Sequence, residues 1–313
     1  MSTANYPNGF AEGVTIRGVP LTVAHPGEVF WVNSTSVLPK RGVGGQAGGP
    51  GTYKQPFATI TQAIAACTAN RGDIVMVMPG YTETIAAAAG EAWNVAGVAI
   101  IGLGGGSLKP TFTFNGVVGA DIDISAANVS VYNFRFVSGL ANITNALDIT
   151  GANVTVDSCE FMASAAGTGM NISATASAAA YGIHFTNNTI NFESSIAGVS
   201  VTDVPNHGFL CQADNAVITG NWILGSYATA AIGSTSAGEG LLITDNSIFN
   251  IGSVAAGGIS MHASATGLAA RNMIRVTYAT NITTLITAAA MGQCENYLNN
   301  ATAESGGKLT AST

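Results

Sequence analysis

Asp123 and Asp148 are the residues of this 313-residue sequence whose type and spacing could support chemistry. They occupy the same position in two matching segments, 121 to 131 and 146 to 156, which start 25 residues apart. If these segments stack as parallel strands, equivalent residues lie about 4.8 Å apart. The two carboxylates could then hold a cation such as calcium, or form a catalytic pair, since glycoside cleavage uses carboxylates about 5 to 9.5 Å apart.

The rest of the sequence favours the alternative, in which the two carboxylates diverge into solvent at some electrostatic cost. The glycine-rich stretch at 42 to 51 lacks the Lys-Ser/Thr ending of a phosphate-binding loop. The four histidines are dispersed and have no acid or nucleophile partnered with them: His25, His184, His207 and His262. We therefore predict a protein that is not an enzyme, with no catalytic residue, cofactor or metal ion. A site built across subunits stays compatible with this expectation.

The elements that would position these residues are short repeated strands. Seven six-residue segments start at 131, 156, 185, 218, 243, 269 and 293, in steps of 24 to 33 residues. Apolar residues alternate in them with small or polar ones, which is the pattern of a strand with one buried face. A near-constant period of this length is typical of a solenoid. We expect an all-β protein, a right-handed parallel β-helix whose coils consist of strand, turn, strand and turn.

Asparagines recur at two positions of this repeat. The fourth residue of the segments is Phe134 in the first, Cys159 in the second and asparagine in the other five. Asparagine tolerates left-handed backbone angles, and its amide can bond to the amide one coil above. We expect two structural ladders, one of Asn128, Asn153 and Asn215 and the other of Asn188, Asn221, Asn246, Asn272 and Asn296.

The alternation also predicts which side chains are buried and which are exposed. Arg135 and Glu160 should form an exposed ion pair on adjacent coils, worth at most about 1 kcal/mol. Trp222, Met273 and Tyr297 share that outward face and predict an apolar contact stripe. The stripe suits a sugar or a protein, and the scarcity of carboxylates near it favours a protein. Ten side chains are expected to point inward: Ile122, Ile124, Val129, Leu147, Ile149, Val154, Phe161, Ile223, Ile248 and Ile274.

Residues 52 to 298 resemble the pectin-lyase-like family of parallel β-helices. Besides the repeats, the resemblance rests on a Pro-Phe-x-Thr-Ile entry at 56 to 60 and a Gly-Asp-x-Val-x-Val-x-Pro-Gly strand at 72 to 80. Between them, apolar residues at helical spacing predict an α-helix that caps the open end of the coil and covers its strand edges. The expected parts are an anchoring arm (1 to 35), a glycine-rich loop with the capping helix (36 to 71), the β-helix (72 to 298) and a tail (299 to 313).

Composition limits the partners. Charged residues make up 9% of the chain, against about 25% in ordinary soluble proteins, so its flat, weakly hydrated faces favour contact with other protein. The net charge is −7 and the basic residues are scattered, which argues against nucleic acid as a partner.

No apolar run reaches the roughly 18 residues of a membrane span, and no secretion signal is recognisable, so we expect synthesis in the cytoplasm. Four widely spaced cysteines are expected to be reduced and buried.

The first residues of the chain are similar to the leading segments of structural proteins of tailed bacteriophages. We interpret them as an arm that anchors the protein to a capsid, through Tyr6, Phe10, Val14, Ile16, Arg17 and Leu21. The function expected is that of a capsid decoration or cement protein on the virion surface, bound to the major capsid protein or other virion proteins. The resemblance implies a homotrimer. The alternative is a tailspike-like protein that binds or degrades host surface polysaccharide, with Asp123 and Asp148 as its carboxylate pair.

Overall fold

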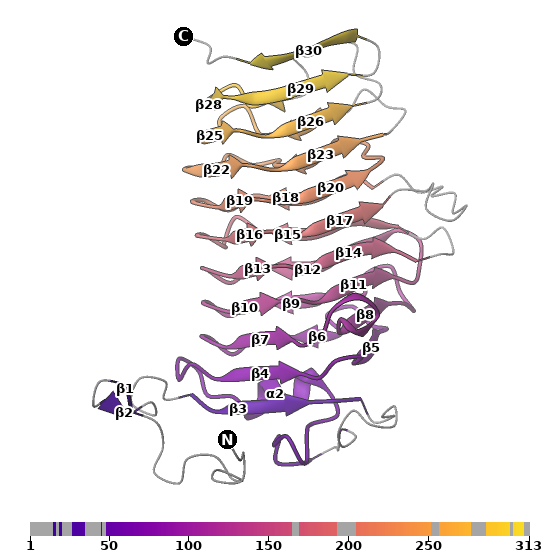
Figure 1. Cartoon of the computed structure of the whole chain (residues 1–313), viewed down its shortest axis with the longest axis vertical. Coiled ribbons are helices and arrows are strands. Elements are labelled where there is room, and N and C mark those ends of the chain that lie inside the picture. The colour runs from indigo at the N-terminus through magenta and orange to yellow at the C-terminus, as the bar shows by residue number, and fades with distance from the viewer. Residues whose placement is uncertain are drawn as a thin grey trace, which may run out of the picture.

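The structure, a computed structural model of the chain, is a tall stack of parallel coils (Figure 1). It describes residues 15–16, 19–20, 27–34, 45, 48–164, 169–192, 205–251, 257–276, 286–300 and 303–309. Successive coils each give one strand to three sheets, so strands far apart in the sequence lie side by side. The predicted all-β parallel solenoid is therefore confirmed, and the eight strands of its third sheet correspond to about eight turns.

The three sheets are named here by the strands that build them. Sheet 1 contains β3 (Val29–Val32), β4 (Ile74–Val77), β7 (Ala99–Gly102), β10 (Ser130–Tyr132), β13 (Thr155–Asp157), β16 (His184–Thr186), β19 (Val217–Thr219), β22 (Leu241–Thr244), β25 (Gly267–Ala270) and β28 (Met291–Cys294). Sheet 2 contains β5 (Thr82–Ile85), β8 (Thr111–Phe114), β11 (Arg135–Ser138), β14 (Glu160–Ala163), β17 (Thr189–Phe192), β20 (Trp222–Gly225), β23 (Ser247–Asn250), β26 (Met273–Val276), β29 (Asn296–Asn300) and β30 (Ala303–Leu309). Sheet 3 contains β6 (Glu91–Ala92), β9 (Ile122–Ile124), β12 (Ile143–Ile149), β15 (Met170–Ala176), β18 (His207–Cys211), β21 (Ala230–Gly233), β24 (Gly257–Ser260) and β27 (Ile286–Thr287).

The core is a continuous column of apolar side chains enclosed by the three sheets. All ten side chains expected to point inward are at most 1% exposed, so the predicted register is confirmed. Aromatic rings stack along the column, with centroid separations of 5.8, 5.0, 6.0 and 4.2 Å between consecutive members of the series Phe112, Phe136, Phe161, Phe185 and Phe209. Such offset contacts between rings add to the stabilisation that burial alone provides.

Two columns of left-handed residues turn the chain at the corners of the coil. Asn128, Asn153 and Asn215 have φ values of 60°, 55° and 54°, which supports the expected corner ladder. The Nδ2 of Asn153 donates to Oδ1 of Asn128 over 3.2 Å. Between Asn153 and Asn215 the corner is occupied by Gly182, whose φ is also positive, so this ladder is interrupted.

The second asparagine ladder is buried and continuous from Asn188 to Asn296. The backbone N–H of each ladder asparagine, from Asn188 up to Asn272, donates to the Oδ1 of the asparagine one coil above over 2.9 to 3.1 Å. Cys159 begins the ladder, since its N–H donates to Asn188 Oδ1 over 2.9 Å. The expectation of left-handed angles was wrong for these asparagines. The positive φ belongs to the residue before each one, for example Asn187 and Asp245, because that residue makes the turn into the strand of sheet 2.

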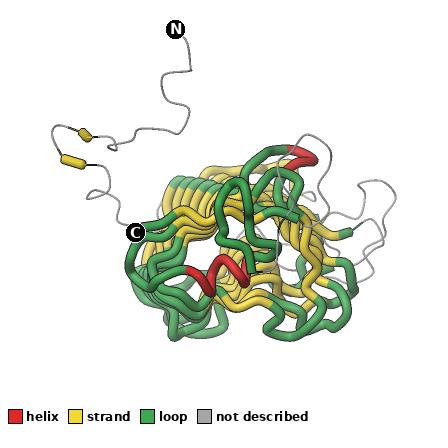
Figure 2. The backbone as a smooth tube through the Cα atoms, turned by 90° about the horizontal axis from the view of Figure 1, so that it is seen from below, coloured by secondary structure: helices red, strands yellow, loops and turns green. Residues whose placement is uncertain are grey.

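Described segments cover the N-terminal end of the solenoid and the C-terminal edge of sheet 2. At the N-terminal end, α2 (Ile60–Ala66) lies across the opening of the coil, as Figure 2 shows, and buries Ile60, Ala63 and Ile64. The free edge of β3 is bonded by the chain at 51 to 57, since Trp31 N–H donates to Gly51 O and Phe57 N–H to Trp31 O. At the other end, β30 pairs antiparallel with β29. The part of the tail from 303 to 309 therefore closes the last coil on sheet 2.

Smaller elements complete the described chain. A 3₁₀ turn, η2 (Gly106–Leu108), precedes β8, and β1 (Thr15–Ile16) pairs antiparallel with β2 (Val19–Pro20). β3 falls within the segment assigned to the arm (1 to 35), but it pairs with β4 and so belongs to the first rung of sheet 1. Within the described chain, no helix has the length and apolar character needed to cross a membrane.

Candidate functional site

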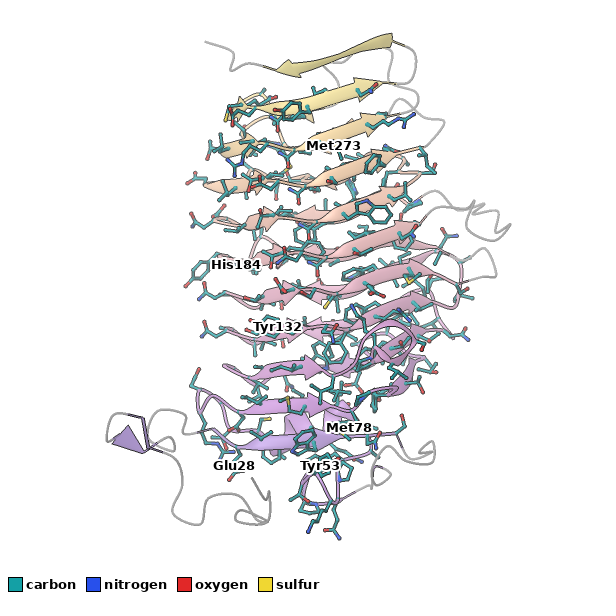
Figure 3. All side chains as sticks on the ribbon, viewed as in Figure 1. Glu28, Tyr53, Met78, Tyr132, His184 and Met273 are labelled. Atoms are coloured by element: carbon teal, nitrogen blue, oxygen red, sulfur yellow. The ribbon has the colours of Figure 1, made fainter. Side chains whose placement is uncertain are left out.

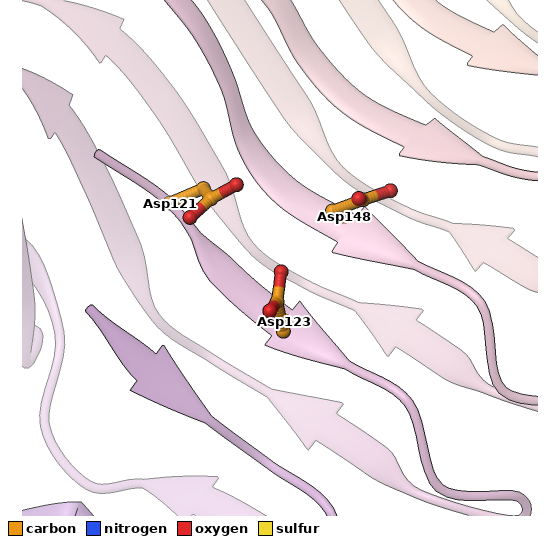
Figure 4. A group of neighbouring side chains, drawn as sticks. All are labelled: Asp121, Asp123 and Asp148. Atoms are coloured by element: carbon orange, nitrogen blue, oxygen red, sulfur yellow. The ribbon is translucent and has the colours of Figure 1, made fainter. Parts of the chain in front are cut away.

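Three aspartates converge on the outward face of sheet 3 (Figure 4). Asp123 of β9 and Asp148 of β12 are direct partners in the parallel register, as the repeat predicts. Asp121 precedes β9 and lies on the same face as Asp123, two residues away. One carboxylate oxygen from each of the three lies within 4.8 Å of the others. The side chains therefore converge instead of diverging, and a third carboxylate joins the two that the sequence analysis singled out.

The acidic cluster formed by these three aspartates is half-buried. Burial, together with the carboxylate of Asp123, raises the pKa of Asp148. Burial also raises the pKa of Asp121. The backbone N–H of Ala89 donates to Asp121 Oδ1 over 2.6 Å and lowers this pKa, but by less than burial raises it. Among the described residues, no Lys or Arg side chain contributes to either shift. The cluster therefore offers oxygen atoms of the kind that calcium prefers, while the residues described around it supply no positive group that would stabilise an oxyanion.

A charged cluster occupies the lower half of the outward face of sheet 2. Arg135 Nε donates to Glu160 Oε2 over 2.8 Å, so the ion pair expected between adjacent coils is present. Lys109 joins it, with its Nζ 2.9 Å from Glu160 Oε1, and it also donates to Ser158 O. Burial alone would raise the pKa of Glu160, but the bonds from Lys109 and Arg135 hold it below its usual value. The expectation of an exposed pair was wrong, because Lys109 covers the carboxylate and leaves its side chain 25% exposed.

The apolar stripe of Trp222, Met273 and Tyr297 lies on the upper half of the same face. The register places Trp222 beside Ser247, Ser247 beside Met273, and Met273 beside Tyr297. The three apolar residues are 38%, 45% and 56% exposed, and Figure 3 marks Met273 among the side chains of these upper coils. Phe249 extends the patch sideways, with its ring centroid 6.5 Å from that of Trp222. The outward face of sheet 2 thus has a charged cluster on its lower coils and an apolar stripe on its upper coils, with the polar Ser247 and the exposed Arg275 beside the stripe.

The described histidines and cysteines are the remaining residue types that could supply a nucleophile or a general base. His184 is exposed, and burial lowers the pKa of His207, whose Nδ1 has no hydrogen-bond partner. The four cysteines are free. Burial raises the pKa of the Cys159 thiol to about 12 and that of Cys211 to about 11, so both thiols stay protonated and unreactive.

A pair of inward-facing glutamates was not anticipated from the sequence. Glu83 of β5 and Glu91 of β6 lie in the first coil, in register with the core residues Phe112 and Ile122 of the coil above. They lie beneath the capping helix, where the Thr61 hydroxyl donates to Glu91 Oε1 over 2.5 Å. No repeat relates these residues to one another or to a later coil, so the period gave no signal for them.

The residues proposed for the anchoring arm fall mostly outside the described chain. Five of them are not described: Tyr6, Phe10, Val14, Arg17 and Leu21. Ile16 lies in β1, whose backbone alone is described. The anchoring role of these six residues therefore stays a prediction.

Comparison with known proteins supports the fold of this chain only. No protein-family model and no curated protein sequence matches this chain. Among solved structures, a rhamnogalacturonan lyase superimposes with a TM-score of 0.57 and 14% sequence identity, over 80% of this chain and 69% of the lyase. In fold, this chain is a parallel β-solenoid that is structurally similar to a rhamnogalacturonan lyase.

Proposed function

We propose that the protein is a non-enzymatic structural protein of a tailed-phage particle, which decorates and stabilises the capsid shell. The observation that carries the proposal is the apolar stripe of Trp222, Met273 and Tyr297 on one face of a rigid solenoid. Exposed apolar patches on otherwise polar surfaces mark contacts with other proteins. Aromatic residues and methionine are also the residue types enriched in such contacts.

The shape of the solenoid suits this role. Sheet 1 stacks ten strands, and nine spacings of about 4.8 Å give a rod about 43 Å long. The face of sheet 2 runs along that rod, so it offers a long and nearly flat contact surface. A standard protein interface buries about 800 Å² on each partner, and a face of this length and the width of one strand segment supplies an area of that order.

The proposed partners are the major capsid protein or other virion proteins, with a homotrimer as the assembled form. In this arrangement the arm at 1 to 35 anchors the rod to the shell. The support for the arm is its sequence, and the support for an assembly is the low charge content of 9%. The proposed location is the surface of the virion, reached after synthesis in the host cytoplasm.

Cosedimentation of the purified protein with phage particles that lack it tests the attachment. The variant that combines Trp222→Ser, Met273→Ser and Tyr297→Ser should bind at least tenfold more weakly, because it removes the apolar area of the stripe. Leu242→Ser is the matched control, since Leu242 is 36% exposed but lies in sheet 1. Equal binding by the triple variant and the control would contradict a role for the stripe. Deletion of residues 1 to 26, which leaves β3 in place, tests the arm in the same assay.

A second candidate function is the binding or cleavage of a polysaccharide, as in a tailspike. Two observations favour it: the similarity in fold to a rhamnogalacturonan lyase and the acidic cluster of Asp121, Asp123 and Asp148. The test is incubation with rhamnogalacturonan and with host surface polysaccharides, followed by chromatography of the products. This candidate predicts cleavage that Asp123→Asn and Asp148→Asn abolish without unfolding the protein. Intact polysaccharide after incubation with the wild-type protein would exclude cleavage.

A further inference from the structure

The first coil of the solenoid contains two carboxyl groups where the higher coils contain hydrocarbon. Glu83 is the register partner of Phe112, and Glu91 is the register partner of Ile122. Both of those partners are fully buried in the core. The two glutamates therefore point into the coil at its N-terminal mouth, the opening that α2 covers in Figure 2. An ionised carboxylate in such a place is costly unless it is paired or hydrogen-bonded.

The contacts of this pair connect it to the capping helix. The Thr61 hydroxyl of α2 donates to Glu91 Oε1 over 2.5 Å, and the Tyr81 hydroxyl donates to Glu83 Oε2. The backbone N–H of Ile60, in the first turn of the helix, also interacts with Glu83. The start of α2 is thus held on the mouth of the coil by polar contacts with both carboxyl groups, in addition to the burial of its apolar side chains.

The two carboxyl groups are also close enough to hydrogen-bond to each other. Such a bond requires a proton, because an ionised carboxylate has no donor. Burial, and then the charge of Glu91, raise the pKa of Glu83 to about 7, and burial also raises the pKa of Glu91, so the pair retains a shared proton below about pH 7. Glu91 is only 5% exposed, and its Oε2 accepts from no nitrogen or hydroxyl group.

No positive charge compensates the pair within the described chain. Tyr81 is the other titratable group that faces it, and burial raises the pKa of Tyr81 so that it stays protonated. The strands and helix packed around the pair, α2, β3, β4, β7 and β8, contain no charged side chain. In β9, Asp123 lies on the opposite, outward face. Loss of the shared proton would therefore leave two adjacent negative charges beneath the helix.

We propose that Glu83 and Glu91 form a proton-dependent clasp, which holds α2 on the mouth of the solenoid and weakens when the shared proton is lost. The clasp does not depend on the proposed function. The direction of the pH effect follows from the difference in proton binding between the closed and the open state. When the helix lifts, Glu83 returns to an ordinary pKa near 4.5, so the closed state binds more protons than the open state between about pH 4.5 and 7. Opening then becomes up to about tenfold more favourable per pH unit in this window and levels off above it.

Hydrogen exchange of the full-length protein, measured by mass spectrometry between pH 5 and 8.5, tests the clasp. Exchange in the peptide that contains α2 is corrected for the intrinsic effect of pH and compared with exchange in the peptide that contains β12, deep in the stack. The wild-type protein should lose protection in α2, and not in β12, as the pH rises from 5 to 7. Glu83→Gln should strongly reduce this pH dependence, because its amide donates to Glu91 at every pH and Glu91 is left as the one titrating carboxyl group of the pair. Glu239→Gln, at an exposed corner, is the matched control and should behave as the wild type.

Infrared spectroscopy provides a second readout that does not need the variant to fold. The wild-type protein should retain the carbonyl band of a protonated carboxyl group at pH 6 and lose it above pH 7. Constant protection of α2 across the pH range, or the absence of that band at pH 6, would overturn the proposal. So would an unchanged pH dependence in a folded Glu83→Gln protein.

Discussion

Replacement of Asn246 tests whether the buried asparagine ladder stabilises the solenoid. The side chain of Asn246 takes part in four hydrogen bonds and lies at the middle of the ladder. It donates through Nδ2 to Ile218 O over 2.9 Å and to Asn272 Oδ1 over 3.0 Å. Its Oδ1 accepts from the N–H of Asn221 over 3.0 Å and from the Nδ2 of Asn221 over 2.9 Å. Asn246→Ala removes all four bonds at once.

The expected cost follows from the groups that lose their partners. The Nδ2 of Asn221 keeps its bond to Phe185 O, and Asn272 Oδ1 keeps the bond from the N–H of Asn246. The backbone N–H of Asn221 and the carbonyl of Ile218 lose the side-chain partner that they have in the wild type. A buried polar group without a partner costs about 1 to 3 kcal/mol. We therefore expect Asn246→Ala to lower the free energy of unfolding by about 3 kcal/mol.

Urea unfolding followed by circular dichroism measures this difference. Ser247→Ala is the matched control, because Ser247 is the next residue and points outward, and it should change the free energy of unfolding by less than about 0.5 kcal/mol. Asn246→Asp keeps the size of the side chain and changes only its hydrogen bonding, so it separates the two contributions to stability. Its carboxylate would face two acceptors, Ile218 O and Asn272 Oδ1, so its stability should fall at neutral pH and recover on acidification, when a protonated carboxyl group can donate. Equal stability of Asn246→Ala and Ser247→Ala would refute the reasoning.

Three other substitutions test the core and the two charged clusters, each by urea unfolding. Ile248→Ala should cost about 2 to 5 kcal/mol, because it leaves a cavity in the column of the core; a cost below about 0.5 kcal/mol would contradict the register. Asp123→Asn should stabilise the protein at pH 7 by about 0.5 to 1 kcal/mol, because it removes a like charge from the cluster. Since the pKa of Asp148 is raised in the folded state, the wild type gains stability as the pH falls through that pKa, and the variant should gain less. Lys109→Met should cost about 1 to 3 kcal/mol, because it leaves the half-buried Glu160 with Arg135 alone; an unchanged stability would mean that the ion pair is screened by water.

Features that recur in every coil could be predicted from the sequence. Residues such as Ile122 and Leu147 recur at one step of the repeat, so their shared face and its burial follow from the period alone. The same step identified Asn188 and its four successors as a ladder. It did not show which residue makes the turn, because the left-handed Asn187 and Asp245 belong to a column of mixed residue types.

Features that occur in one coil could not be predicted in this way. Asp121 shares a face with Asp123, and the Asp-x-Asp spacing could have indicated this. The counterpart of Asp121 one repeat later is Ala146, so the comparison of repeats did not identify Asp121 as a member of the cluster. Lys109 reaches Glu160 from the turn before β8, a contact that depends on the three-dimensional path of a loop. Glu83 and Glu91 look like surface residues in the sequence, and only the register of the first coil turns them inward.

Immunogold labelling of purified phage particles tests the central claim most directly, because it requires no assumption about activity. An antibody against the solenoid should label the head of wild-type particles and should not label particles from which the protein has been deleted. The account predicts label distributed over the capsid. Label confined to the tail, or its absence from the particle, would contradict a capsid decoration role, and label on the tail would favour the polysaccharide candidate.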